Sequence, residues 1–326
     1  MPTVSLANGK TFPAPRTDTI LEAAGRGGVV LEQGCSDGRC GACRTRLIAG
    51  TTTTALPEAA LTLEESGAGW ILPCVRRAET DVELDAVDLT GIRLPPVRTL
   101  PARIRDITRI ASEVMVITLR LPPRERLDFE PGQHVELISP MGVKRRYSIA
   151  NAPREDATLE LHLRRVEGGE MSDYVFERAA VGDLLRLRGP FGTFQLGRDL
   201  GEDLVLLATG TGIAPIRAMI EDLLARPAGQ CPSSLSLYWG ARHEDDLYWR
   251  PNDPRVKFVP VLSRGDVNWS GARGHVQNVL LAERGVSPET VVFACGSASM
   301  VNSARVVLRD AGLSPYGYRF EVFTVS

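Results

Sequence analysis

The spacing of four cysteines constrains this chain more than any other feature of its sequence. Cys35, Cys40 and Cys43 lie in one short loop, and Cys74 follows separately, further along the chain. A Cys-x4-Cys-x2-Cys run with a distant fourth cysteine is the plant-type pattern, in which four thiolates hold a [2Fe–2S] cluster. The sequence therefore predicts an iron–sulfur centre, which passes one electron at a time.

The glycines of the same loop support this prediction. Gly34, Gly38 and Gly41 are free to take positive φ, so the loop can curl with its backbone amides close to the sulfurs. Zinc and a disulfide are the alternatives for four cysteines. Structural zinc sites usually combine two Cys-x2–4-Cys pairs, whereas the cysteines here divide three plus one.

Length, charge and composition narrow the class of protein. A chain of 326 residues exceeds what one hydrophobic core usually serves, and we expect three domains. The formal net charge of −2, without a long basic run, argues against nucleic acid as a partner. Residues 1–10 do not resemble a signal peptide, and no stretch approaches the roughly 20 apolar residues of a membrane span. We expect a cytoplasmic monomer whose thiols stay reduced and bind metal.

The first expected domain, residues 1–91, is β-rich, with one helix before the cysteine loop and another before Cys74. Thr62 is a candidate N-cap of the second helix, because acidic residues follow in its first turn. Residues 1–90 hold eight Lys and Arg against twelve Asp and Glu, a net charge of −4. This charge suits either a docking surface for a basic partner or an ordinary solvated surface. Residues 92–101 contain three prolines and are expected to form an extended, stiff linker.

The second expected domain, residues 102–198, alternates short apolar segments such as 114–119 with turns, which predicts an antiparallel β-barrel. Arg145 and Tyr147 share one face of a predicted strand. A guanidinium suits a pyrophosphate, and a phenol ring suits a flat heteroaromatic group. The glycines of segment 166–172 precede a helix-like stretch that would present its amides to the same phosphates.

The third expected domain, residues 199–326, alternates strands and helices, which predicts a parallel α/β sheet. The strand at 204–208 runs into Gly210-Thr211-Gly212-Ile213-Ala214-Pro215, and a glycine turn between a strand and a helix is a dinucleotide pyrophosphate site in outline. The strand at 291–294 ends in Cys295 and Gly296, at the edge where ligands bind in such sheets. The four histidines are too scattered for a metal or triad site, and Cys231 is expected to be an inert loop thiol.

Taken together, these motifs resemble the reductase components of multicomponent, Rieske-type aromatic-ring oxygenases, over essentially the whole chain. The resemblance implies a β-grasp plant-type ferredoxin, an antiparallel β-barrel FAD domain and a Rossmann-like parallel α/β nicotinamide domain. The residues that match the family's cofactor motifs are Arg145, Tyr147, Ser148, Gly169, Glu170, Met171, Ser172, Gly210, Thr211, Gly212, Ala214, Pro215, Cys295 and Gly296. Thr209 and Gly34 stand where many relatives have glycine and serine, which predicts an altered affinity or potential.

The resemblance also implies roles for individual side chains. Ser148, Cys295, Glu321 and Phe323 would act at the catalytic site, with Cys295 near the hydride-donating carbon and Phe323 against the flavin. His162 and Arg164 would contact FAD. Whether the nucleotide carries a 2′-phosphate depends on the segment after the second strand of the domain. Arg242 and Arg264 favour that phosphate and the acids at 244–246 disfavour it, and we expect NADH rather than NADPH.

The resemblance implies a relay from NADH to FAD, to the [2Fe–2S] cluster and then to a terminal Rieske or di-iron oxygenase of aromatic hydrocarbon catabolism. Plant-type clusters lie near −400 mV and Rieske centres at roughly −150 to +300 mV, so delivery to a Rieske centre is downhill. Arg39, Arg44 and Arg46 are expected to raise the potential of the cluster, or else to form a docking face or a solvated surface. A deoxysugar-biosynthesis reductase of the same architecture and a zinc-binding scaffold are the alternative functions.

Overall fold

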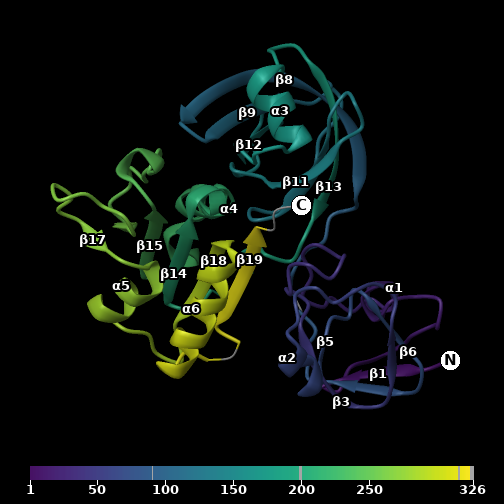
Figure 1. Ribbon diagram of the computed structural model, residues 1–326. Helices are drawn as coiled ribbons and strands as arrows, with labels where there is room; N and C mark the ends of the chain where they lie inside the picture. Colours follow the sequence, from purple (N-terminus) through teal and green to yellow (C-terminus); the bar gives the residue numbers. More distant parts are fainter. Residues whose placement is uncertain (90, 198–199, 315, 324–326) are drawn as a thin grey trace. The chain divides into compact units, whose positions relative to one another are not determined.

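The computed structural model describes residues 1–89, 91–197, 200–314 and 316–323, and the chain divides into two compact units (Figure 1). The first unit comprises Met1–Arg93 together with Gly192–Phe194, and the second comprises Leu94–Phe191 and the described residues from Gln195 onward. The expected boundary between the second and third domains, at 198/199, lies outside the described residues. No helix in these described ranges is long and apolar enough to cross a membrane.

The first unit is a β-grasp domain. Its main sheet has the strand order β2-β1-β7-β3-β5, in which β1 and β7 are parallel and the other pairs are antiparallel. Helix α1 (Ile20–Arg26) buries Ile20, Ala23 and Ala24 in the core of this sheet. The strands of this unit are β1 (Thr3–Leu6), β2 (Thr11–Pro13), β3 (Thr45–Ala49), β4 (Thr52–Thr54), β5 (Trp70–Ile71), β6 (Arg76–Ala78) and β7 (Val82–Leu84).

The helix expected before Cys74 is confirmed as α2 (Leu63–Gly67). Thr62 is its N-cap: the Thr62 hydroxyl accepts a hydrogen bond from the Glu65 amide, and the Glu65 carboxylate accepts one from the Thr62 amide. This reciprocal capping box satisfies two of the free amides at the helix start. The five-residue helix is therefore fixed at its first turn by its own sequence.

The second unit begins with a six-stranded antiparallel sheet of order β11-β10-β13-β8-β9-β12. A single antiparallel bridge between Ile149 and Leu161 joins its two ends. Helix α3 (Glu170–Glu177) packs Met171, Tyr174 and Val175 into the core that this sheet encloses. The strands are β8 (Arg98–Ala111), β9 (Val114–Arg120), β10 (His134–Ile138), β11 (Lys144–Ser148), β12 (Thr158–Arg164) and β13 (Leu184–Phe191).

Strand β8 corrects the expected linker. It begins at Arg98, so residues 98–101 pair with β13 instead of continuing a tether. Pro101 lies opposite Arg186 in this ladder. Proline favours extended backbone, so the composition that suggested a linker also permits a strand.

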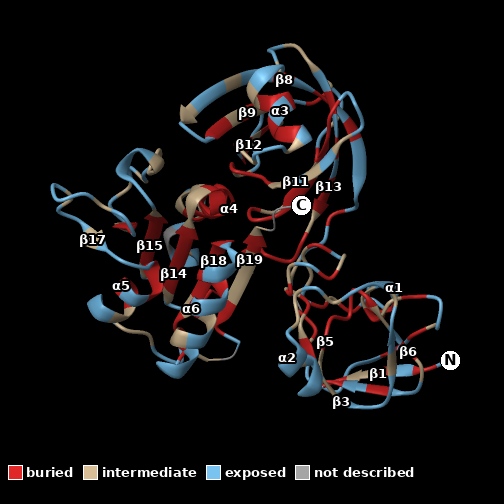
Figure 2. Ribbon diagram, viewed as in Figure 1, coloured by how far each residue is buried: buried red, intermediate tan, exposed pale blue. Residues whose placement is uncertain are grey.

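The rest of the second unit is a parallel sheet of order β17-β16-β15-β14-β18-β19, with α4 (Ile213–Ala225), α5 (Val276–Glu283) and α6 (Ala298–Asp310) packed on it. Its central strands are buried along their length, and so is most of α4, whereas α5 and α6 keep exposed outer surfaces (Figure 2). The strands are β14 (Asp203–Thr209), β15 (Ser234–Ala241), β16 (Lys257–Leu262), β17 (Ala272–Arg273), β18 (Val291–Ser297) and β19 (Tyr318–Phe323).

The order of these strands sets the position of the glycine turn. The chain runs from β14 to β15 on one side, and later returns to β18 on the other side of β14. The carboxyl end of β14 is therefore a topological switch point, where open α/β sheets bind their ligands. The predicted turn follows β14 directly as a short 3₁₀ segment, Gly210–Gly212, and α4 begins at Ile213.

Backbone contact holds this turn against the end of β18. A Cβ at Gly212 would lie 2.2 Å from the carbonyl oxygen of Cys295, and a Cβ at Gly296, where φ is +148°, would lie 2.1 Å from the Thr209 hydroxyl. Only glycine lets the two segments approach so closely. The hydroxyl of Thr209 accepts a hydrogen bond from the Ser297 amide at 3.2 Å, which joins the same two segments.

We expect Gly212→Ala to lower the free energy of unfolding by about 1–3 kcal/mol, because the new methyl group must displace the Cys295 backbone. Urea denaturation of the full chain measures this change. Gly229→Ala is the matched control, since a Cβ there meets no atom within 4 Å. Equal stability of the two variants would contradict the close backbone contact.

Candidate functional site

The four predicted ligands converge in the first unit as two pairs. The Cys35 amide donates to the Cys40 sulfur and the Cys40 amide to the Cys35 sulfur, both at 3.3 Å. A thiol hydrogen bond from Cys40 lowers the pKa of Cys35 to about 6, while the same contact raises the pKa of Cys40. Cys43 and Cys74 are related in the same way, with the pKa of Cys74 lowered and that of Cys43 raised.

This arrangement fits two irons better than one metal ion. Two thiolate pairs give each iron of a [2Fe–2S] cluster two protein ligands. Gly38 and Gly41 have positive φ as predicted, and Ser36 does too, whereas Gly34 does not. At Gly34 the absence of a side chain instead allows close packing, because a Cβ there would lie 3.1 Å from the Cys40 sulfur. The pairing of Cys35 with Cys40 and of Cys43 with Cys74 therefore suits the two irons of such a cluster.

The arginines of this region lie in different environments. The side chain of Arg44 is only 8% exposed and pairs with Glu65 at 2.6 Å. It also donates to the Ala60 carbonyl at 2.7 Å, and the Ala60 amide donates to Gly38 within the cysteine loop. Arg44 therefore fastens the segment before α2 to the loop. Arg39 and Arg46, by contrast, are exposed.

The predicted flavin residues of the barrel lie on β11 and at the start of α3. Arg145 and Tyr147 alternate along β11 on one face, as expected from the strand period. Burial raises the pKa of the Tyr147 phenol, so its ring is neutral. At α3, Gly169 is the N-cap without a side-chain cap. The first turn of this helix, Glu170, Met171 and Ser172, therefore offers backbone amides to an anion.

A carboxylate joins this barrel to the parallel sheet. Glu321 on β19 accepts a hydrogen bond from the Ser148 hydroxyl at 2.6 Å, and its other oxygen lies 3.1 Å from Nδ1 of His134. The Cys295 sulfur lies 3.8 Å from the oxygen that Ser148 contacts. Three of the four predicted catalytic residues thus meet at one point, while Phe323 lies further along β19 opposite Ser297.

The thiol of Cys295 is fully buried, and this burial raises its pKa well above the ordinary value, with the Glu321 carboxylate as a further cause. The group is therefore a neutral thiol and not a nucleophilic thiolate. Its chemical contribution at this site is a small, polarisable contact surface beside the carboxylate.

His134 is the site residue that the sequence reasoning missed. It lies directly opposite Ser148 in the β10–β11 ladder, so the two side chains share a face and each reaches one oxygen of Glu321. The residue is 4% exposed, and its Nε2 has no hydrogen-bond partner among the described residues. The signal that could have identified His134 is its position at the start of a strand that pairs with the Arg-x-Tyr-Ser strand. Recognising this signal requires the register between the two strands.

The glycine turn presents the predicted dinucleotide residues at the switch point. Thr209 and Gly210 are partly exposed, whereas Thr211, Gly212, Ala214 and Pro215 are buried. Pro215 lies in the first turn of α4, where its missing amide leaves no helical hydrogen bond unmade. The Gly210 backbone has a φ of +53° and lies beside the Arg164 guanidinium of the barrel.

His162 and Glu160 form a buried polar pair on β12. His162 Nε2 lies 3.1 Å from Glu160, and Nδ1 lies 3.1 Å from the Tyr248 hydroxyl. Burial raises the pKa of Glu160, but the hydrogen bond from His162 and the charge of Arg217 outweigh it and lower the pKa to about 2. Both ring nitrogens of His162 are thus engaged by protein groups, and a contact of this ring with FAD stays a prediction.

The residues expected to choose between nucleotides lie at the carboxyl ends of two neighbouring strands. Arg242 follows β15, Arg264 follows β16, and the Arg264 amide donates to the Arg242 carbonyl at 3.2 Å. The acids at 244–246 form the short 3₁₀ segment Glu244–Asp246 next to them. Both arginines and Glu244 are exposed, so a nucleotide could meet either charge.

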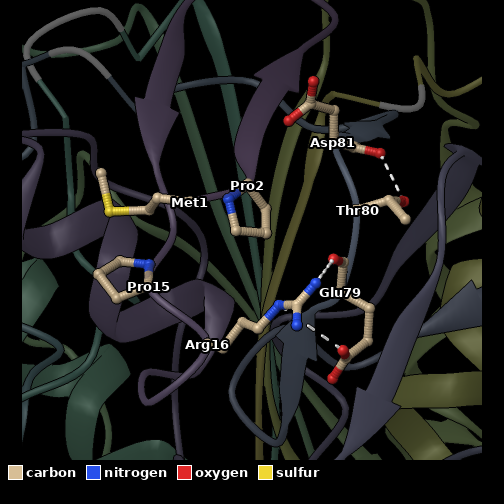
Figure 3. A pocket seen from close by; sticks show the side chains of 7 residues that line it. All are labelled: Met1, Pro2, Pro15, Arg16, Glu79, Thr80 and Asp81. Carbon is tan, nitrogen blue, oxygen red and sulfur yellow. Dashed lines mark hydrogen bonds and ion pairs between the residues drawn. The ribbon is translucent and has the colours of Figure 1, made fainter.

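A surface hollow in the first unit is not part of this chemistry. It is lined by Met1, Pro2, Pro15, Arg16, Glu79, Thr80 and Asp81 (Figure 3). The Arg16 guanidinium donates to the Glu79 carbonyl at 2.9 Å and lies 3.8 Å from the Glu79 carboxylate. None of the predicted cofactor residues lines this hollow, Arg16 and Glu79 are paired with each other, and Asp81 accepts a hydrogen bond from the Thr3 amide at 2.8 Å.

Three sequence families match successive parts of the chain. A 2Fe-2S iron-sulfur cluster binding domain matches residues 5–79, an oxidoreductase FAD-binding domain matches residues 101–196, and an oxidoreductase NAD-binding domain matches residues 206–306. The cysteine pairs, the Arg-x-Tyr-Ser strand and the glycine turn each fall within the matching region. The chain therefore has [2Fe–2S], FAD and nicotinamide dinucleotide domains.

Relatives of known function are similar over nearly the whole chain. A CDP-6-deoxy-L-threo-D-glycero-4-hexulose-3-dehydrase reductase of Yersinia pestis is 34% identical, covering 98% of this chain and 97% of the relative. Reductase component 1 of terephthalate 1,2-dioxygenase from a Comamonas species is 31% identical, with 97% and 95% covered. The reductase subunit of an aromatic O-demethylase from an Amycolatopsis species is 35% identical, with 94% of each chain covered.

Solved structures agree with these sequence relationships. The crystal structure of an Amycolatopsis cytochrome P450 reductase has a TM-score of 0.74 and 33% identity, and the match covers 100% of this chain and 99% of that one. A ferredoxin reductase in carbazole 1,9a-dioxygenase, at 22% identity and a TM-score of 0.72, shares the fold. The chain belongs to the iron–sulfur flavoprotein oxidoreductases, the electron-transfer reductases that combine a [2Fe–2S] ferredoxin domain with FAD- and NAD-binding domains.

Proposed function

We propose that this protein is the NADH-dependent reductase of a terminal oxygenase, and that it delivers electrons to that oxygenase through FAD and its [2Fe–2S] cluster. The observation that carries the proposal is that one chain combines two cysteine pairs with a catalytic cluster of Ser148, Cys295 and Glu321. When bound, FAD supplies the conversion of one hydride into two separate electrons, and the cluster supplies single-electron transfer.

The protein's own residues would hold and orient these groups. Arg145 and the amide-rich start of α3 would bind the FAD phosphates, and Tyr147 and Ser148 would line its ring. Glu321 holds the Ser148 hydroxyl in place, and His134 lies where it can donate to the other oxygen of the same carboxylate. Together, Glu321 and His134 can hold a proton at a carboxylate oxygen or an imidazole nitrogen, next to the site where hydride arrives.

The nicotinamide dinucleotide would lie across the carboxyl ends of β14 and β18. Thr209, Gly210, Thr211 and Gly212 would meet its pyrophosphate, and Cys295 and Gly296 would meet the nicotinamide end. We propose NADH as the nucleotide, because the acidic segment Glu244–Asp246 lies beside Arg242 and would disfavour a 2′-phosphate.

The proposed domains are 1–91, a second domain that starts with β8 at Arg98 instead of 102 and ends at 198, and 199–326, in a monomeric cytoplasmic protein. An oxygenase partner is supported by the Comamonas and Amycolatopsis relatives, which are named as parts of dioxygenase and demethylase systems. A second candidate is supported by the Yersinia relative, whose name makes it a dehydrase reductase of a deoxysugar. The two functions share every cofactor site described above and differ only in the acceptor.

Comparing acceptors distinguishes the two functions. The purified protein is mixed with NADH and either a Rieske oxygenase with its aromatic substrate or a hexulose dehydrase with its bound sugar intermediate. We expect hydroxylated product in the first mixture. Product in the second mixture alone would assign the protein to deoxysugar synthesis.

Replacing one cluster ligand separates the two kinds of electron transfer. We expect Cys74→Ser to abolish reduction of a one-electron acceptor such as cytochrome c, because one iron loses a thiolate. Reduction of a two-electron acceptor by NADH should persist, since the flavin and dinucleotide residues lie on other elements. Parallel loss of both activities would count against separate sites.

Removing the charge of Glu321 tests the catalytic cluster. Glu321→Gln keeps an acceptor for Ser148 but removes the negative charge, and we expect NADH-driven flavin reduction to slow by about 10²-fold at unchanged FAD content. Stopped-flow absorbance follows this reaction, and the exposed Glu289→Gln serves as the control. A rate within about twofold of the wild type would remove Glu321 from the mechanism.

A further inference from the structure

A row of side chains runs from the flavin barrel to the glycine turn. Glu160 and His162 lie on β12 of the barrel, Tyr248 lies after β15, and Trp239 is near the end of β15. The last member of the row, Trp239, donates its indole N–H to the carbonyl of Gly210 at 3.0 Å. The row thus ends on the first residue of the turn where the dinucleotide is expected.

The barrel end of this row is fixed by charge. Arg217 of α4 forms an ion pair with Glu160, and its Nε also donates to Glu221 at 3.1 Å. Arg154 lies 3.5 Å from Glu221, and Glu221 accepts from the Ala152 amide at 3.1 Å. The start of the row is therefore tied both to β12 and to the helix that follows the glycine turn.

The direction of the hydrogen bonds follows from the charge on Glu160. A carboxylate with a pKa of about 2 is ionised near neutral pH and can only accept, so His162 donates to it from Nε2. Burial lowers the pKa of His162, which leaves the ring neutral and its Nδ1 an acceptor. The Tyr248 hydroxyl is then the donor to Nδ1, at 3.1 Å.

The middle of the row is held by ring packing. The Tyr248 ring stands edge-on to His162, with centroids 5.5 Å apart, and edge-on to Trp239, with centroids 5.1 Å apart. Trp239 is fully buried, so its indole has little freedom to rotate. Displacing Tyr248 would therefore move the indole that holds Gly210.

The geometry points to Tyr248 and Trp239 as positioning residues for the nicotinamide dinucleotide, which transmit the position of the flavin barrel to the glycine turn. The peptide unit between Gly210 and Thr211 is planar, so a fixed Gly210 carbonyl aims the Thr211 amide in the opposite direction. The Ile213 amide also donates to this carbonyl. Trp239 thus supplies a second hydrogen bond to it, from a side chain that packs against the row leading to the barrel. This inference rests on the proposed function and adds residues that the family motifs do not include.

The test uses Tyr248→Phe, Trp239→Phe and the double variant of the full-length holoprotein. Tyr238→Phe is the matched control, because that hydroxyl is on the same strand as Trp239 but bonds to Glu283 at 3.1 Å. Calorimetry measures the dissociation constant for NAD⁺, absorbance measures bound FAD, and steady-state kinetics gives KM and kcat with NADH.

We expect each single variant to weaken NAD⁺ binding about three- to tenfold, with a matching rise in KM and unchanged FAD content, as the loss of one hydrogen bond predicts. We compare the double variant with the single variant that has the lower affinity for NAD⁺. The affinity of the double variant should be lower by no more than about twofold, because both substitutions interrupt the same row.

The inference would be overturned if the single variants bound NAD⁺ as tightly as the Tyr238→Phe control does. It would also be overturned if the loss of NAD⁺ affinity in the double variant equalled the product of the two single losses. Because Tyr248→Phe removes only one oxygen atom, this variant still decides the question if Trp239→Phe fails to fold. A wild-type protein that binds neither FAD nor NAD⁺ would instead contradict the proposed function.

Discussion

The carboxylate of Glu321 is the contact on which the proposed catalytic arrangement depends. It comes from the last strand of the parallel sheet, yet its hydrogen bonds reach Ser148 and His134 on two paired strands of the barrel. A largely shielded carboxylate needs such partners, because an isolated charge inside a protein costs several kcal/mol. The same contact therefore joins the two halves of the second unit and gathers the groups that would handle hydride and proton.

Close backbone packing provides the other half of the site. Gly212 and Gly296 let the glycine turn and the end of β18 approach without side chains between them. Cys295 is held at that junction, fully buried and 3.8 Å from Glu321. The dinucleotide edge of the sheet and the flavin face of the barrel are thus connected through neighbouring residues of β18 and β19, which pair in register.

The sequence was most informative where function depends on local spacing. The cysteine loop, the Thr62 N-cap and the turn after β14 are each contained in a few successive residues, and the structure contains all three elements. Within the loop, Gly38 and Gly41 take the predicted positive φ and Gly34 does not. The boundary of the linker was wrong at residues 98–101, because extended backbone suits both a proline-rich tether and a strand. Local composition does not reveal whether a partner strand is available.

Residues that act through distant partners could not be found in this way. His134 gains its role from a β10–β11 register and from Glu321, which is 187 residues away in the sequence. Tyr248 and Trp239 resemble ordinary core aromatics until the tertiary structure places them between His162 and Gly210. Such roles depend on tertiary contacts, which spacing rules do not encode.

The central claim is that a two-electron site and a one-electron cluster operate in the same chain. Anaerobic titration of the reconstituted protein with a calibrated reductant, followed by absorbance, counts the electrons that each chain accepts. We expect about three electrons per chain, two for FAD and one for the [2Fe–2S] cluster. A capacity of about two electrons, or a preparation without iron, would contradict it.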